Sequence, residues 1–189
     1  MTQGVGTLTA EQALTSLKDM TADLEPIQLP EYQARIKKAQ ALMQANGIDA
    51  MYLNAGTNLT YFTGLQWYAS ERLVGAIVPA QGDVTLIAPA FEVGSLTQAM
   101  VVPLNTLLWD EHESPYDHFV QFLQTQGLTE GKLALDESCS YSIIANLEER
   151  YPAAKMVDAK VITAACRMQK SEAELALIQR AMDMTLAVH

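Results

Sequence analysis

Residues 54–92 read NAGTNLTYFTGLQWYASERLVGAIVPAQGDVTLIAPAFE, and this stretch decides the fold. Its second half contains two apolar, β-rich runs, LVGAIV at 73–78 and VTLIA at 84–88. Between them lies PAQGD at 79–83, in which the proline and Gly82 supply the chemistry of a tight turn. Two β-rich runs joined by a short turn predict a β-hairpin.

An aromatic segment, YFTGLQWY at 61–68, precedes the hairpin. Its four aromatic residues fit neither the period of a strand nor that of a helix, so we expect a loop that presents ring faces to another group. Trp67 and Tyr68 follow Gly64 in this loop, and Arg72 comes shortly after them. Rings beside a guanidinium suit a substrate carboxylate or a proline ring, whereas a dimer-interface patch explains the same residues equally well.

Helical and strand patterns alternate along the rest of the chain. Capping residues and apolar periodicity predict helices at 9–20, 31–46, 91–100, 115–126, 141–150 and from 171 onward. Short β-rich runs predict strands at 49–53, 106–109, 132–136 and 155–157. Strands that alternate with helices are typical of a sheet covered on both faces, so the sequence predicts an α/β fold.

The composition favours one packed domain and argues against nucleic acid and membranes as partners. The 189 residues are 49% hydrophobic and 18% charged, as in a globular protein with a full core. Asp and Glu outnumber Lys and Arg by 22 to 12, and the net charge of −10 repels phosphate backbones and anionic membranes. We therefore expect neither nucleic acid nor a membrane as a partner.

The cysteines and the N-terminal residues indicate the cellular compartment of the protein. Cys139 and Cys166 are two cysteines in a chain large enough to fold without a disulfide. The N-terminal residues show neither the basic nor the apolar region of a secretory signal, and no apolar run approaches the roughly 20 residues of a membrane-spanning helix. We expect a cytoplasmic protein with reduced thiols.

Catalytic and metal-binding patterns are not recognisable in the sequence. The spacing of His112 and His118 matches neither a helical zinc pair nor a Cys/His cluster, and the Glu-His-Glu run at 111–113 is expected to be a solvated loop. Cys139 precedes a helix but has no histidine near it in sequence, so a structural thiol is expected. We predict no catalytic residue and no metal ligand in this chain.

The order of the motifs NLTYFTG, SER, LVGAIVP, QGD, VTLIAP and FE resembles the N-terminal domain of the creatinase/prolidase/aminopeptidase P family, above all Xaa-Pro peptidases of bacterial type. The resemblance extends from about Tyr32 to the end of the chain. It implies a three-layer fold similar to ribonuclease H, with a mixed β-sheet flanked by helices. It also implies an N-terminal extension at 1–30, the creatinase/prolidase-type domain at 31–166, and, at 167–189, a linker with the first helix of a C-terminal catalytic (pita-bread) domain.

The resemblance also implies a function, that of the non-catalytic N-terminal domain of a dinuclear-metal Xaa-Pro peptidase, either a dipeptidase or an aminopeptidase P-like enzyme. The implied cofactors are two divalent metal ions (Mn, Co or Zn) held by the catalytic domain. The implied partners are that domain, a second copy of the chain in a homodimer, and a small peptide substrate. In dimeric members the corresponding loop closes over the substrate of the neighbouring subunit, so Trp67, Tyr68 and Arg72 are candidate substrate-side residues supplied in trans.

Two other functions stay open at this point. A creatinase-like amidinohydrolase has the same kind of N-terminal domain, and a stand-alone interaction or ligand-binding domain has no catalytic partner. The helix expected from 171 onward still continues at His189, which favours a chain with a further domain over the stand-alone one. Its apolar stripe of Leu175, Ile178 and Met182 is expected to be exposed without that domain, and the chain alone is expected to be inactive.

Overall fold

The structure is a computed structural model that describes residue 6 and residues 8–188. It contains two compact units, a larger one at Leu29–Gln169 and a smaller one formed by the described residues before 29 together with 170–188. Within the described residues, no helix is long and apolar enough to cross a membrane.

The larger unit is built on a six-stranded mixed sheet with the order β4-β3-β2-β1-β5-β6. Its strands are β1 (Ala50–Asn54), β2 (Gly75–Pro79), β3 (Thr85–Pro89), β4 (Asn105–Trp109), β5 (Gly131–Leu135) and β6 (Ala154–Asp158). The pairs β1–β2 and β2–β3 are antiparallel, whereas β3–β4, β1–β5 and β5–β6 are parallel. The predicted hairpin is therefore β2–β3, and the predicted mixed sheet is confirmed.

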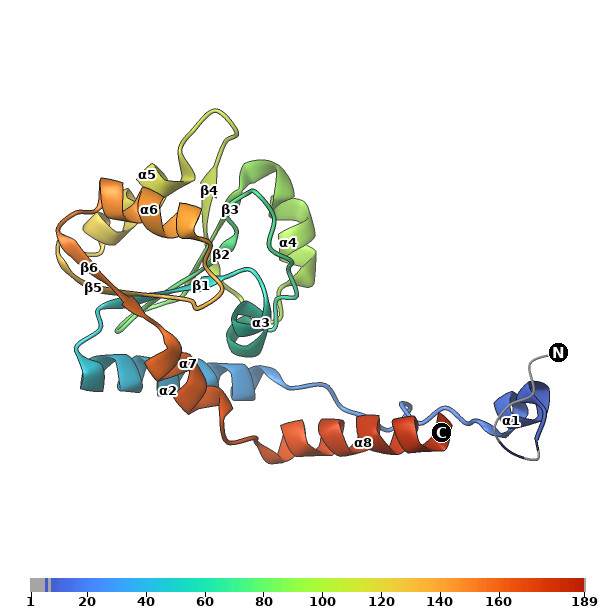
Figure 1. The fold of residues 1–189 in the computed structure, drawn as a ribbon. Coiled ribbons are helices and arrows are strands. Elements are labelled where there is room, and N and C mark those ends of the chain that lie inside the picture. The colour runs from blue at the N-terminus through green and yellow to red at the C-terminus, as the bar shows by residue number, and fades with distance from the viewer. Residues whose placement is uncertain (1–5, 7, 189) are drawn as a thin grey trace. The chain divides into compact units, whose positions relative to one another are not determined.

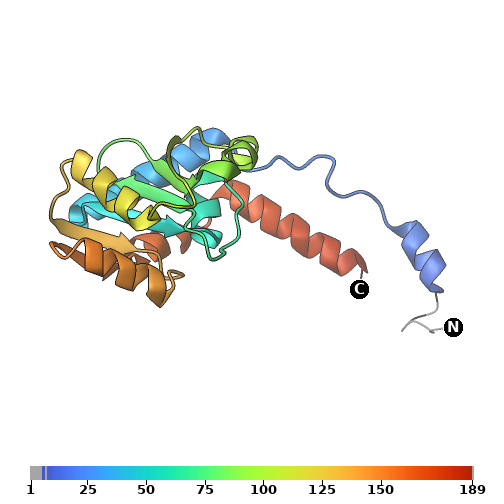
Figure 2. The same ribbon diagram turned by 90° about the horizontal axis from the view of Figure 1, so that it is seen from above.

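Helices cover both faces of the sheet (Figure 1). Those of the larger unit are α2 (Leu29–Asn46), α3 (Thr57–Thr63), the 3-10 turn η1 (Ala90–Glu92), α4 (Val93–Ala99), α5 (Pro115–Thr125), α6 (Tyr141–Arg150) and α7 (Lys160–Arg167). Helices α5 and α6 lie side by side on one face, and α2, α3 and α7 lie on the other (Figures 1 and 2). The three-layer α/β prediction is therefore confirmed.

Alternation along β1 creates a separate core on each face, because successive side chains of a strand point to opposite sides. Met51 and Leu53 pack with the α2, α3 and α7 side chains, in a core that includes Met43, Phe62 and Ile162. On the other face, Ala50 and Tyr52 pack with the α5 and α6 side chains. That second core includes Phe119, Leu123, Leu133 and Leu147.

The aromatic segment is partly helical, which corrects the expectation of a loop over 61–68. Helix α3 runs through Tyr61 and Phe62 and ends at Gly64, whose φ of 76° is the left-handed conformation of a helix C-cap. Its buried side chains are Asn58, Leu59, Phe62 and Thr63. The helical spacing begins with residues upstream of the aromatic segment, so the segment alone did not reveal it. The loop itself occupies the residues between α3 and β2.

Most predicted helices and strands occur within a few residues of their expected positions. Gly47, with a φ of 60°, follows the end of α2 as the sequence indicates, and the hydroxyl of Ser114 accepts from the Asp117 amide to cap α5. Helix α7 was not predicted. Its strongly amphipathic sequence KVITAACR places Ile162 and Cys166 in the core beneath α2.

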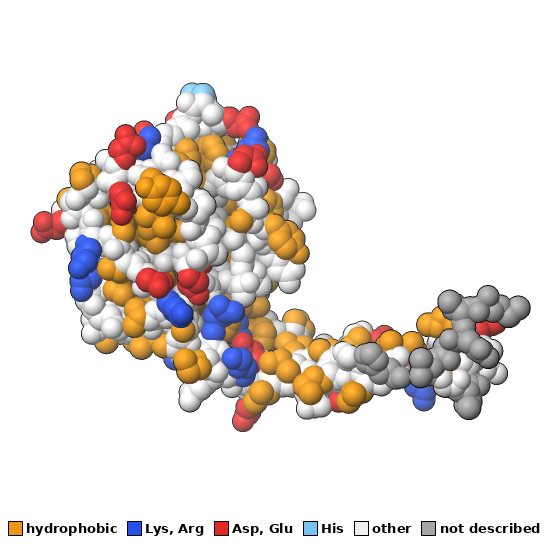
Figure 3. Space-filling view, viewed as in Figure 1, with side chains coloured by type: hydrophobic (Ala, Val, Ile, Leu, Met, Phe, Trp, Pro, Cys, Tyr) orange, Lys and Arg blue, Asp and Glu red, His pale blue; other side chains and the backbone are white. Residues whose placement is uncertain are grey.

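The smaller unit contains two capped helices, α1 (Ala10–Ser16) and α8 (Glu172–Val188). Both predicted capping boxes form, one between Thr9 and Gln12 and one between Ser171 and Glu174. Helix α8 has no buried residue, and apolar side chains lie along it (Figure 3). The stripe residues Leu175, Ile178 and Met182 are 45–55% exposed.

Gly75 gives a test of the packing around the central strand. A Cβ at this position would lie 2.3 Å from the Leu53 carbonyl oxygen and 2.5 Å from the Tyr52 ring, and neither group can move without disturbing β1. We expect Gly75→Ala to lower the free energy of unfolding by about 1–3 kcal/mol or more, measured by urea denaturation. The matched control is Gly94→Ala in α4, where a Cβ meets nothing within 4 Å. The control is expected to change stability by less than about 1 kcal/mol. Equal effects of the two substitutions would contradict the tight approach at Gly75.

Candidate functional site

The loop between α3 and β2 holds the three candidate substrate-side residues, and it places them in different environments. The Trp67 ring is partly buried and packs against the core beneath α2 and α3. Tyr68, the next residue, is 91% exposed. Trp67 therefore anchors the loop to its own domain, whereas Tyr68 presents its ring and hydroxyl to the surroundings.

Arg72 lies in an ion pair at the end of the loop. Its Nε and Nη2 donate to Glu111 Oε1 at 3.3 and 2.7 Å, and its Nη1 donates to Glu71. The hydrogen bond to Glu111 raises the pKa of the Arg72 guanidinium. The guanidinium stacks over the ring of Phe91 at 5.2 Å, a contact that the sequence did not predict. Three of its five N–H donors are thus used within this chain, and two are left for a substrate carboxylate.

The loop at 110–114 is held by hydrogen bonds of its own. The Glu113 carboxylate accepts from the Asp110 amide at 2.8 Å and lies 3.1 Å from His118 Nε2. The hydrogen bond from the Asp110 amide lowers the pKa of Glu113, with the histidines as a smaller cause. Among residues 6 and 8–188, no three His, Cys, Asp or Glu side chains are grouped so that they hold a metal ion.

The two cysteines are unsuited to nucleophilic chemistry. Desolvation by burial, followed by the nearby Asp136 carboxylate, raises the pKa of the Cys139 thiol to about 12. Burial also raises the pKa of Cys166, which packs against α2. Both thiols are therefore protonated at neutral pH, whereas the thiolate is the nucleophile.

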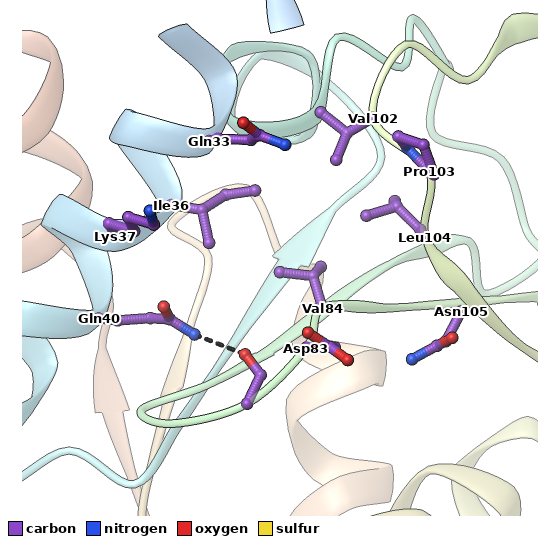
Figure 4. A pocket seen from close by; sticks show the side chains of 11 residues that line it. Gln33, Ile36, Lys37, Gln40, Asp83, Val84, Val102, Pro103, Leu104 and Asn105 are labelled. Carbon is purple, nitrogen blue, oxygen red and sulfur yellow. Dashed lines mark hydrogen bonds between the residues drawn. The ribbon is translucent and has the colours of Figure 1, made fainter. Parts of the chain in front are cut away.

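A groove of about 510 Å³ lies between α2, the β2–β3 turn and the segment before β4 (Figure 4). Gln40 crosses one end of it, where its amide donates to the carbonyl oxygens of Pro79 and Gly82 at 3.0 and 2.9 Å. The charged side chains at its rim, Lys37 and Asp83, are exposed and of opposite sign. Exposed groups of both signs do not select one charge type, so the groove by itself assigns no ligand.

A comparison with known protein families identifies the fold. Residues 35–169 match the Creatinase/Prolidase N-terminal domain family. The chain belongs to this family. The creatinase/prolidase domain thus covers nearly the whole of the larger unit, and the resemblance in the motifs of 54–92 is confirmed.

Solved structures share the fold of this creatinase/prolidase domain at low sequence identity. The prolidase from Thermococcus sibiricus aligns over 77% of this chain and 39% of its own, with a TM-score of 0.69 and 24% identity. The dipeptidase PepE from Mycobacterium ulcerans aligns over 87% of this chain and 50% of its own, with a TM-score of 0.74 and 20% identity. The N-terminal domain of Xaa-Pro dipeptidase from Lactobacillus brevis aligns over 72% of this chain and 99% of its own, with a TM-score of 0.61 and 19% identity.

A curated relative gives a further sequence match. The agropine synthesis cyclase of Rhizobium rhizogenes is 27% identical over 124 residues, which are 62% of this chain and 31% of the relative. The chain spans about a third of this relative's length and 39% of the Thermococcus prolidase. The matched region is therefore one part of each of these longer proteins.

The different burial of Trp67 and Tyr68 predicts different effects of truncation. Trp67→Ala removes a partly buried ring that packs against the core, and it is expected to lower the free energy of unfolding by about 1–3 kcal/mol. Tyr68→Ala removes an exposed ring and is expected to change stability by less than about 0.5 kcal/mol. Urea denaturation of both variants checks this pair of expectations. A larger loss from Tyr68→Ala than from Trp67→Ala would reverse the assignment of anchor and exposed residue.

The buried Cys139 thiol predicts a loss of stability at high pH. An unfolded cysteine titrates near pH 8.5, whereas the pKa of Cys139 in the folded chain is about 12, so unfolded chains release this proton first as the pH rises. The thiol therefore favours the folded chain equally at all pH values below about 8, and this contribution declines between about pH 8.5 and 12. From pH 7.5 to 9.5 we expect the natural chain to lose about 1 kcal/mol more than Cys139→Ala, measured by urea denaturation at both pH values. Identical losses would show that the thiol titrates normally.

Proposed function

We propose that this chain is the non-catalytic N-terminal domain of a longer dinuclear-metal peptidase that cleaves Xaa-Pro peptides, as a dipeptidase or an aminopeptidase P-like enzyme. The family match over residues 35–169 carries the proposal. The shared fold of the prolidase and Xaa-Pro dipeptidase structures supports it. The greater length of the Thermococcus prolidase and of PepE supports it as well. In this proposal the two divalent metal ions (Mn, Co or Zn) belong to the catalytic domain.

Within this proposal, the loop between α3 and β2 acts on the substrate of the neighbouring subunit in a cytoplasmic homodimer. Trp67 fixes the loop to the core, and the exposed Tyr68 reaches the peptide. Arg72 is held by Glu71 and Glu111, so its first role is to shape the end of the loop. Its remaining N–H donors then bind a substrate carboxylate.

A creatinase-like reaction is the second candidate. The relative that matches by sequence is described as a cyclase, so the same domain occurs in a protein that is not described as a peptidase. The presence of such a domain therefore does not fix the reaction of the whole protein, and the substrate must be decided by assay.

The test uses the full-length protein, supplied with Mn²⁺ or Co²⁺, and an Xaa-Pro dipeptide, an Xaa-Pro tripeptide and creatine as substrates. We expect hydrolysis of an Xaa-Pro bond by the full-length protein, and none by the 189-residue chain alone. Hydrolysis of creatine without peptidase activity would establish the second candidate instead.

The role of Tyr68 is tested in the same protein. Tyr68→Ala is expected to lower kcat/KM about tenfold while the dimer stays intact in sedimentation, because a contact made to the bound substrate is lost. The matched control is Tyr141→Ala in α6, a tyrosine outside the loop that is 81% exposed, which should leave kcat/KM unchanged. A weaker dimer with unchanged kcat/KM per dimer would show that Tyr68 belongs to an interface patch.

A further inference from the structure

Strand β4 is an edge strand of the sheet, and it pairs with β3 alone. Its residues match Thr85–Pro89 of β3 one to one, without a bulge. Among the described residues, no backbone group of 105–109 is hydrogen-bonded to any other segment. Alternate N–H and C=O groups of β4 therefore point outward without a backbone partner in the described chain. An edge of this kind is able to pair with a strand of another molecule.

The two edges of the sheet differ in how they are protected against such pairing. Native proteins block a sheet edge with charged side chains, proline or bulges. The other edge strand, β6, carries Lys155 and Asp158, and both are exposed. Strand β4 has the sequence NTLLW, which contains neither a charged residue nor a proline. The protein therefore protects the edge at β6 and leaves the edge at β4 open.

Strand β4 belongs to a long run of the chain that is uncharged and mostly accessible. Residues 93–109 contain no Asp, Glu, Lys, Arg or His, although 18% of the chain is charged. Only Leu96, Val102 and Trp109 of this run are buried. The other long uncharged run, at 50–70, holds β1 and α3 and is largely buried. Charged residues are depleted at the centre of protein–protein interfaces, so the accessible run at β4 is typical of a surface that another protein molecule covers.

Both cores of the larger unit reach β4, and both are incompletely covered there. Leu107 packs against the core beneath α5 and α6, whereas Leu108 packs against the core beneath α2 and α3. Each of the two side chains is only partly buried, because no strand follows β4 in the sheet. A further strand beside β4 would cover both side chains and bond the outward backbone groups at the same time. The occupant that this edge fits is therefore a β-strand.

The charges that flank β4 indicate which strand that is and in which direction it runs. The acidic segment DEHE at 110–113 follows β4, whereas residues 101–104 before it are uncharged. In an antiparallel pair of two β4 strands centred on Leu107, residues 110–113 of each copy lie opposite residues 104–101 of the other. Each acidic segment then faces an uncharged one, whereas a parallel pair would place like charges opposite each other, which is destabilising. The edge is thus complementary to itself, as a two-fold dimer requires, despite the net charge of −10.

We propose that two copies of this chain pair antiparallel along β4, about a two-fold axis at Leu107, so that their sheets join into one continuous sheet. Leu107 then lies beside the partner's Leu107 on one face, and Thr106 lies beside the partner's Leu108 on the other. The inference rests on the homodimer of the proposed function and names its interface. Its test needs no substrate, so a failure of the pairing is distinguishable from a failure of the peptidase assay.

The test follows the sedimentation of the 189-residue chain over a range of concentrations. We expect a dimer, and we expect Thr106→Lys to raise its dissociation constant about tenfold or more, because a lysine at a sheet edge opposes pairing with another strand. Thr106 is exposed, so this change leaves the fold intact. The matched control is Thr129→Lys, the same change at an exposed position outside β4, which should leave the dissociation constant unchanged. A monomeric chain, or a dimer that Thr106→Lys does not weaken, would overturn the proposal.

A third variant separates this edge from the exposed apolar stripe of α8. Ile178→Glu charges the stripe and is expected to leave the dimer unchanged. A dimer that Ile178→Glu weakens and Thr106→Lys does not would place the interface on α8 instead.

Hydrogen exchange of the backbone amides tests the strand pairing itself. Alternate amides of residues 105–109 point away from β3, and they gain a bond only when a second copy is present. We expect these amides to be protected at concentrations where the dimer forms and to exchange fast where it dissociates. Exchange in β4 that does not change between the two concentrations would contradict the pairing.

Discussion

The burial of strand β1 on both faces is the constraint on which the larger unit depends. All five of its residues are buried, and it pairs with β2 on one edge and with β5 on the other. Tyr52 at its centre makes an edge-to-face contact with Phe119, with ring centroids 5.3 Å apart, and its hydroxyl donates to the Val74 carbonyl oxygen or to Asn54. The neighbouring strand can approach this ring only because position 75 is glycine. The two cores therefore meet at one strand that tolerates little change in side-chain volume.

Strand β1 also separates two kinds of sheet. On the antiparallel side, the loop of Trp67 and Tyr68 leads into β2, so its position is set by the end of α3 and the start of the hairpin. The parallel side has the connection β5–α6–β6, which gathers carboxyl ends at one edge. The candidate loop therefore belongs to the antiparallel side.

Within the loop, the burial of apolar area contributes more to stability than the ion pair does. The ion pair between Arg72 and Glu111 is short, but both side chains are well exposed, at 39% and 61%. Exposed pairs of this kind contribute little stability, about 0–1 kcal/mol, because water screens the charges and ordering the side chains costs entropy. The partly buried Trp67 ring is the stronger attachment, since removal of apolar area from water is not screened. The exposed Tyr68 is consequently presented on a loop that is fixed by its neighbour.

The sequence by itself determined the local elements of this protein. Two apolar, β-rich runs and the turn at Gly82 specify the hairpin, capping residues specify the starts of α5 and α8, and the order of motifs in 54–92 specifies the family. These features are local because turn, cap and strand preferences depend on a few adjacent residues. Helix α3 was not predicted, because its apolar spacing starts upstream of the aromatic segment at 61–68.

Only the tertiary structure decided which side chains meet. The pairing of Arg72 with Glu111 joins residues from two loops, and the sequence gives no sign of it. The unpaired edge of β4 likewise depends on the strand order, which places β4 outermost although it is neither the first nor the last strand along the chain. Local preferences fix elements, but burial, hydrogen-bond satisfaction and charge clustering arise only when the chain packs, and the candidate sites of this protein depend on these.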